Sequence, residues 1–124
     1  DVFITSESVI TGSIGTLANH VDVSGLEKSI GIKTTPITAG KFKAIASAFA
    51  PLTAEGRADI QGRLDHVSDA LVKAIAKFKG VDVKTVNSEM GDGKVFVGSQ
   101  GIKAGLVDGI MEPDELIDRI NASV

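Results

Sequence analysis

The sequence contains no cysteine among its 124 residues, which excludes disulfide bonds, thiolate metal sites and cysteine nucleophiles. Tryptophan and tyrosine are also absent, and aromatic residues make up only 4% of the chain. Because 43% of the residues are nevertheless apolar, a core must be built from Ile, Val, Leu and Ala. A chain of this length corresponds to one domain, or to most of one.

Other absences limit the partners of the chain. The chain has 13 Lys and Arg against 16 Asp and Glu. It has no basic patch with interleaved aromatic residues, so we expect no nucleic-acid partner. No apolar run approaches the roughly 20 residues needed to span a bilayer, so we expect no membrane span in this chain. The two histidines, His20 and His66, are too few and too scattered for a metal site, and we expect neither metal nor cofactor.

Apolar and glycine patterning predicts strands that alternate with helices. We expect strands or extended segments at residues 2–5, 9–17, 32–38, 94–97 and 106–110. The longest helix is predicted at 53–79, with one face formed by Ile60, Leu64, Val67, Leu71, Ile75 and Phe78. Shorter helices are predicted at 22–31, 82–89, 99–104 and from Pro113, and residues 39–52 read as a loop packed over a site. This order favours an α/β fold with parallel pairing.

Two glycine-flanked segments carry side chains that could take part in catalysis. Thr11–Gly15 contains the hydroxyl of Ser13, and Gly40–Lys43 contains two amines. A lysine held in an apolar setting loses its proton readily and can act as a general base, and a nearby hydroxyl would fix its direction. This is the supporting half of a serine/lysine hydrolase. Lys41 and Lys43 face the same side of an extended segment, so alternation cannot separate them.

Four segments resemble the signal peptide peptidase A family, and most closely its bacteriophage branch, the capsid-assembly proteases. They are Ser8–Gly15, Asn19–Asp22, Thr38–Lys43 and Gly98–Asp108. The similarity runs from about Val2 to Ile110, with the motifs in the family's order and spacing. The resemblance implies a ClpP/crotonase-like fold and a Ser/Lys catalytic dyad.

The resemblance also implies roles for individual residues. In the family's glycine-x-x-lysine pattern, Lys43 is the base, and Ser13 matches a serine that steadies it. Gly12 and Gly40 would lie at the bound substrate. The family's nucleophile lies in a serine-containing helix start upstream of Asp1. We therefore expect residues 1–124 to be the C-terminal part of a single protease domain that lacks its N-terminal part, and to be inactive alone.

Other interpretations compete with the protease. Ser13, His20 and Asp22 together suggest a Ser/His/Asp triad, although their order matches none of the known triads. Gly91–Gly93 is expected to be a turn and not a dinucleotide loop. The chain could be a non-catalytic assembly or scaffold module of the same fold, or a crotonase-like acyl-CoA enzyme. That last chemistry needs no dyad lysine, so the segment around Lys43 counts against it.

The resemblance implies partners and places as well. We expect a peptide or protein substrate, and a homo-oligomer because the implied fold family commonly forms rings. Capsid or scaffold proteins are further expected partners. A phage protein would act in the cytoplasm of the bacterial host or be associated with the virion, and a signal peptide peptidase-like protein would be membrane-associated.

Overall fold

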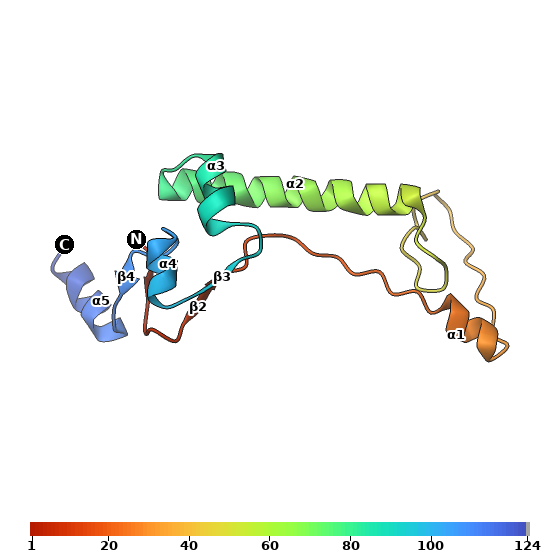
Figure 1. Cartoon of the computed structure of the whole chain (residues 1–124), viewed down its shortest axis with the longest axis horizontal. Coiled ribbons are helices and arrows are strands. Elements are labelled where there is room, and N and C mark those ends of the chain that lie inside the picture. Colours follow the sequence, from red (N-terminus) through yellow and green to blue (C-terminus); the bar gives the residue numbers. More distant parts are fainter. Residues whose placement is uncertain (124) are drawn as a thin grey trace. The chain divides into compact units, whose positions relative to one another are not determined.

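The computed structural model describes residues 1–123, which divide into two compact units. The first unit combines Asp1–Thr16 with the described residues from Ser68 onward, and the second is Leu17–Val67. Whether the two belong to one incomplete domain stays a prediction. In chain order the elements in Figure 1 are β1 (Phe3–Ile4), β2 (Ile10–Gly12), α1 (Ser24–Ser29), α2 (Ala54–Lys79), α3 (Val83–Thr85), the π-helical turn η1 (Val86–Met90), β3 (Val95–Val97), α4 (Ser99–Lys103), β4 (Gly109–Ile110) and α5 (Pro113–Asn121).

The strands of the first unit form two small pairs. β1 pairs with β4 in parallel, with Phe3 opposite Gly109. β2 pairs with β3 in antiparallel register, with Thr11 opposite Phe96. The expected α/β mixture is therefore present, but parallel pairing holds for one pair only, and the described sheets are much smaller than a ClpP-like domain requires. Residues 106–108, predicted to be extended with β4, carry no strand.

The hydrophobic core lies in the first unit and is built without aromatic residues, as the composition predicts. Ile14 follows β2 and packs with Val72 and Ala76 of α2, and with Val86 and Met90 of η1. Full burial of a Val, Ile or Met side chain contributes about 1.5–3 kcal/mol, and the methyl group of Ala76 contributes less. The core thus joins the end of β2 to the C-terminal part of α2.

The predicted apolar face of α2 is only partly the buried one. Phe78 is 83% exposed and Val67 is also exposed, whereas Ile75 packs against the core. The buried hydrophobic positions of this helix are Val72 and Ala76. The predicted face of α2 was chosen from its large apolar residues. Ala76 was not included because its side chain is small.

The second unit begins with α1, close to where a helix was predicted. The Oδ1 of Asp22 accepts the backbone N–H of Ser24 at 2.9 Å as the helix begins. Gly31, with φ 75°, follows the end of the helix, which fits a C-terminal glycine. The strand predicted at 32–38 is wrong: these residues form no strand and all are exposed. Pro36 removes a donor there, and no described strand lies alongside to pair with the segment.

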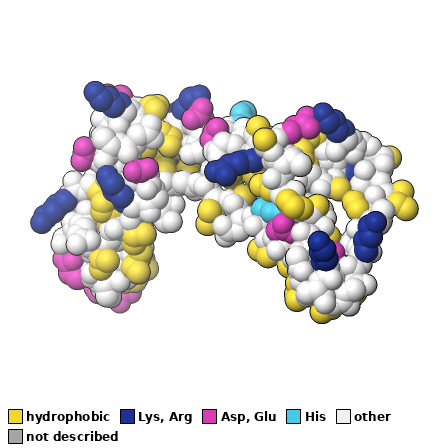
Figure 2. Space-filling view, turned by 45° about the vertical axis from the view of Figure 1, so that its right-hand side comes forward, with side chains coloured by type: hydrophobic (Ala, Val, Ile, Leu, Met, Phe, Trp, Pro, Cys, Tyr) yellow, Lys and Arg dark blue, Asp and Glu magenta, His cyan; other side chains and the backbone are white. Residues whose placement is uncertain are grey.

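Apolar side chains of the second unit are largely exposed. No hydrophobic side chain of Leu17–Val67 is fully buried among the described residues. Figure 2 shows hydrophobic side chains in yellow at the surface, interspersed with charged ones. The large exposed ones in this unit are Leu17, Val21, Leu26, Ile30, Ile32, Ile37, Phe42, Phe49 and Val67.

The long helix α2 has the start and stop signals that the sequence predicts. The Oγ1 of Thr53 accepts the backbone N–H of Gly56 at 3.0 Å, and so satisfies a donor in the first turn. Gly80 follows the last residue with φ 66°. Residues 39–52 ahead of the helix are a turn-rich loop, as expected.

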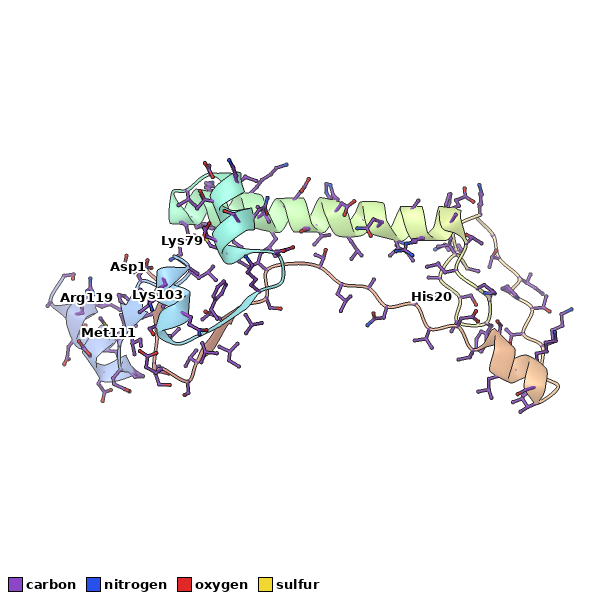
Figure 3. All side chains as sticks on the ribbon, viewed as in Figure 1. Asp1, His20, Lys79, Lys103, Met111 and Arg119 are labelled. Atoms are coloured by element: carbon purple, nitrogen blue, oxygen red, sulfur yellow. The ribbon has the colours of Figure 1, made fainter. Side chains whose placement is uncertain are left out.

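The C-terminal elements also follow their local signals. Asp82 Oδ1 accepts the N–H of Thr85 at 2.6 Å and caps α3, and this bonding lowers the pKa of Asp82. Pro113 occupies the first turn of α5. Arg119 of α5 lies 3.8 Å from the carboxylate of Asp1 and 5.3 Å from the ring centre of Phe3, which ties α5 to the start of the chain (Figure 3).

Candidate functional site

Lys43 lies in a loop of consecutive turns in the second unit. Its N–H donates to the carbonyl of Gly40 at 3.2 Å, and the N–H of Ile45 donates to Phe42 at 3.4 Å. Gly40 has φ 103°, a conformation that favours glycine. The Lys43 side chain is exposed, and no hydrogen bond or ion pair of its amine is found within residues 1–123. The apolar burial expected for a base is therefore not supplied by these residues.

Lys41 is the other lysine considered as the base, and among the described residues its amine, unlike that of Lys43, is ion-paired. Its Nζ lies 2.5 Å from Oε1 of Glu55, in the first turn of α2, and 5.4 Å from the ring centre of Phe42. A general base must reach the reacting proton, and in this structure the amine of Lys41 is directed to a carboxylate instead. The structure thus distinguishes two lysines that the strand alternation could not.

Ser13 stands directly after β2, where the strand ladder is distorted. It has φ 55°, which is rare for a residue with a side chain, and its N–H donates to the carbonyl of Lys94 at 2.7 Å. The preceding Gly12 has φ 104°, and a Cβ atom there would lie 2.5 Å from the same carbonyl. Glycine is therefore required at position 12, and the hydroxyl of Ser13 is carried on a strained, exposed turn.

The two proposed dyad-supporting groups belong to different units. Ser13 is in the first unit and Lys43 is in the second. The contact by which Ser13 would steady Lys43 therefore stays a prediction, as do the places of Gly12 and Gly40 at the substrate.

His20 and Asp22 have structural partners in the second unit. The Nε2 of His20 lies 3.0 Å from the carbonyl oxygen of Ser47, and the N–H of Val23 donates to Ala48 at 2.7 Å. Hydrogen bonding from Ser24 lowers the pKa of Asp22, and the charge of His20 adds a smaller effect in the same direction. These contacts hold the loop that carries Lys43 against the segment before α1, and His20 is labelled there in Figure 3. Sequence reasoning did not assign this tethering role to His20.

Two cavities flank the same loop within the second unit. The larger, of about 590 Å³, is mostly apolar, and its polar lining includes His20 and two arginines. A smaller cavity of about 260 Å³ lies between the loop and the start of α2. Lys43 lines neither of them. The larger is lined by Ala18, Asn19, His20, Ala46, Leu52, Arg57, Ile60, Gln61, Arg63, Leu64 and Val67, and the smaller by Lys41, Ala44, Ile45, Ser47, Ala50, Pro51, Thr53 and Glu55.

Two residues near Lys43 were missed by sequence reasoning. Glu55 makes the ion pair with Lys41, and Gly56 lies directly against Ile45 of the loop. A glycine in the first turn of a long helix is a weak signal by itself, because Gly is tolerated there at a cost. Only the fold reveals that the loop approaches the helix at that position.

In the first unit, outside the proposed site, the carboxylate of Asp108 contacts both Val2 and Lys79. Asp108 accepts the N–H of Val2 at 2.5 Å, and its two oxygens lie 3.1 and 3.2 Å from the ammonium of Lys79. The hydrogen bond from Val2 lowers the pKa of Asp108, and Lys79 lowers it further. These contacts link the residue before β1, the end of α2 and the segment before β4. They have no evident catalytic role.

The model of peptidase family S49 matches residues 1–124, which is the whole sequence. The chain belongs to peptidase family S49. Three relatives agree with this. A protein of Methanocaldococcus jannaschii named as a protease is 30% identical over 120 residues, which cover 97% of this chain and 38% of the relative. The head-tail preconnector protein GP5 of Enterobacteria phage P21 is 33% identical over 106 residues, 86% of this chain and 21% of the relative. An Enterococcus faecium protein named for the signal peptide peptidase SppA is 28% identical over 120 residues, 97% and 35% respectively.

The family assignment confirms the resemblance drawn from the sequence, including its link to phage head proteins. This S49 chain spans between about a fifth and two fifths of the length of these relatives. None of the helices within residues 1–123 is both long and apolar enough to cross a membrane.

Proposed function

We propose that a protein containing this S49 chain is a serine endopeptidase in which Lys43 is the general base. The observation that carries the proposal is the difference between the two lysines that follow Gly40. The amine of Lys41 is held by Glu55, whereas the amine of Lys43 has no such partner among the described residues. The peptidase family, with relatives named as a signal peptide peptidase and a protease, supports the reaction class.

The attacking group in this proposal is a serine outside residues 1–124. Its hydroxyl oxygen bonds to the scissile carbonyl carbon while its proton passes to the neutral amine of Lys43. The resulting ammonium gives that proton to the leaving amine as the C–N bond breaks, which leaves an ester. Water, deprotonated by the same amine, then hydrolyses the ester and frees the serine. Backbone amides near the nucleophile would stabilise the oxyanion.

Ser13 has the supporting role in this proposal. Its hydroxyl would accept or donate a hydrogen bond that directs the amine of Lys43 toward the nucleophile. The exposed position of Ser13 on a strained turn, with Gly12 beside it, is compatible with such a role. An extended peptide would lie against the strand end near Gly12 and the loop at Gly40.

The biological setting remains part of the proposal. We propose that the peptidase acts in phage head maturation, and the relationship to a head-tail preconnector protein supports this setting. The substrates would be capsid or scaffold proteins, and the active form would be a homo-oligomer in the host cytoplasm or the virion. A membrane-associated signal peptide peptidase is the cellular counterpart.

A non-catalytic scaffold module of the same fold is a second candidate function. It is favoured by the many exposed apolar side chains of the second unit, which an assembly partner could cover. A scaffold requires no particular amine at position 43, whereas a peptidase does.

Paired lysine variants test the catalytic proposal. In the active protein that includes this chain, Lys43→Ala should lower kcat on fluorescently labelled casein by at least about 10³-fold, because a proton-transfer group contributes roughly 10²–10⁴. Lys41→Ala is the matched control, since it removes an exposed amine two residues away and should reduce kcat less than about fivefold. Equal losses, or a larger loss for Lys41→Ala, would show that Lys43 is not the base.

A further inference from the structure

Gly56 allows the loop that carries Lys43 to lie directly on the first turn of α2. It is buried, whereas the adjacent Glu55 and Arg57 are exposed. A Cβ atom on Gly56 would lie 2.9 Å from Cγ1 of Ile45, 3.0 Å from the carbonyl oxygen of Ile45 and 3.1 Å from Cδ1 of Leu52. The first of these distances is shorter than real Cβ atoms show, and the second, which involves backbone, is tighter than nine in ten real Cβ contacts. A side chain at position 56 would therefore press on the loop, which would have to give by a few tenths of an ångström.

Ile45 and Lys43 move together because the loop between them is hydrogen-bonded. The N–H of Lys43 donates to Gly40, that of Ile45 to Phe42, and that of Ser47 to Ala44 at 3.0 Å. These overlapping hydrogen-bonded turns restrict the backbone conformation of residues 40–47. A shift of Ile45 away from α2 would therefore be transmitted to the backbone of Lys43, only two residues earlier.

The same two segments are joined a second time by the ion pair of Lys41 with Glu55. Both side chains are more than half exposed, so this pair contributes little by itself. It does show that the start of α2 contacts the loop on both sides of Lys43, at positions 41 and 45. The contact of Ile45 with Gly56 is the closer of the two, because it involves the backbone of Ile45 as well as its side chain.

We propose that Gly56 is a positioning residue for the general base. Its missing side chain sets how closely the loop approaches α2, and so fixes the place of the Lys43 amine relative to the substrate. This proposal rests on the proposed function, in which Lys43 is the base. A misplacement of about 1 Å at a catalytic group can cost on the order of 10²-fold in rate, so a small shift of the loop would be visible in kcat.

The helix provides its own matched control. Gly62 lies six residues further along α2, is exposed, and has nothing within 4 Å of where a Cβ atom would be. Alanine is also the better helix former, so neither substitution removes a residue that the helix prefers. Gly56 lies in the capped first turn and Gly62 in the helix interior, and only at Gly56 would the new methyl group meet the loop.

The experiment compares these two variants in the active protein that includes this chain, with fluorescently labelled casein as substrate. Gly56→Ala should lower kcat by at least tenfold, leave KM within about twofold, and shift the midpoint of the pH–kcat profile. Gly62→Ala should leave all three unchanged. Loss of folded protein alone would lower the amplitude of the pH profile without moving its midpoint, and circular dichroism measures the folded fraction.

A second variant tests the proposal even where Gly56→Ala folds poorly. Ile45→Ala removes the side chain that rests on Gly56 while leaving α2 intact, and it should also lower kcat and shift the pH midpoint. Wild-type kcat and pH profile in Ile45→Ala, or in a folded Gly56→Ala, would overturn the positioning role. Lys43→Ala separates the two proposals: full activity in that variant would overturn the base assignment, whereas an inactive Lys43→Ala beside a wild-type-like Gly56→Ala would overturn only the role of Gly56.

Discussion

At Ser13 the backbone enters the left-handed region just as β2 ends, and the residue there is not glycine. Such a conformation costs a residue with a Cβ roughly 1–2 kcal/mol relative to glycine. The neighbouring Gly12 meets a similar requirement with no side chain at all. A serine at this strained position is what we would expect if its hydroxyl were used.

Substitution of Ser13 tests this use. Ser13→Ala keeps the Cβ and the strain and removes only the hydroxyl, so kcat should fall by about ten- to a hundredfold without a change in thermal stability. Ser13→Gly should show the same loss of kcat but a free energy of unfolding higher by up to about 1–2 kcal/mol, because the strain is relieved. Steady-state kinetics and urea unfolding measure the two effects.

A different result would change the assignment of Ser13. If Ser13→Ala were as inactive as Lys43→Ala, Ser13 would be a candidate nucleophile and not a supporting hydroxyl. Labelling with a fluorophosphonate probe, followed by peptide mapping, would then find the probe on the peptide that contains Ser13.

Asp108 gives a second residue-scale prediction, concerning pH. Its pKa in the folded chain is lowered by the N–H of Val2 and by Lys79, so the folded state favours the carboxylate more than the unfolded state does. The stabilisation is therefore complete above the ordinary carboxyl pKa of about 4 and is lost as the pH falls through the lower, folded value. The difference in free energy of unfolding between wild type and Asp108→Asn should be constant from pH 7 to 5 and shrink toward pH 3.

Urea unfolding at several pH values measures this difference. Asp69→Asn is the control, because Asp69 is an exposed carboxylate on α2 for which no partner is found among the described residues. A difference for Asp108→Asn that grew as the pH fell would contradict the direction of its pKa shift.

Among the elements, α2 begins with a capped first turn. Thr53 accepts a hydrogen bond from Gly56, the same residue on which Ile45 rests. Thr53→Ala should therefore reduce the free energy of unfolding by about 1 kcal/mol, the usual cost of a lost N-cap. Thr53→Ser keeps the hydroxyl and should cost much less, as urea unfolding would show. A loss for Thr53→Ser equal to that for Thr53→Ala would exclude the cap as the cause.

The sequence predicted elements well where a single local signal decides the structure. The bounds of α2 were predicted within one residue, because Thr53 and Gly80 mark its two ends. Asp82 and Pro113 likewise mark the starts of α3 and α5. Each of these signals acts within about four residues, through a capping hydrogen bond or a fixed φ angle, and so does not depend on the rest of the fold.

Predictions failed where partners distant in sequence decide. Residues 32–38 alternate like a strand but find no neighbouring strand in the described chain, and Ile37 is 96% exposed. The contact of Gly56 with Ile45 and the ion pair of Glu55 with Lys41 are invisible to any pattern of spacing. The choice of Lys43 over Lys41 came from resemblance and stays a prediction, to which the structure adds the ion pair of Lys41 with Glu55.

In the molecule as a whole, the hydrophobic core and the loop that carries Lys43 belong to different units. The aliphatic core of Ile14, Val72, Ala76, Val86 and Met90 belongs entirely to the first unit. The loop that carries the proposed base, with its contacts to His20, Glu55 and Gly56, belongs to the second unit. A division between a packed core and less stable functional segments is common in enzymes, because loops that act on substrates are drawn from the less stable end.

This division has a consequence on the scale of time. Amide protons exchange with solvent only when their hydrogen bonds open, and opening is slowest where apolar burial must be undone. The single helix α2 should therefore show two exchange regimes: hours or longer for amides around Val72 and Ala76, and seconds to minutes for the turns before Val67. Hydrogen–deuterium exchange followed by mass spectrometry would resolve the change of rate within one unbroken helix, and a uniform rate along α2 would contradict it.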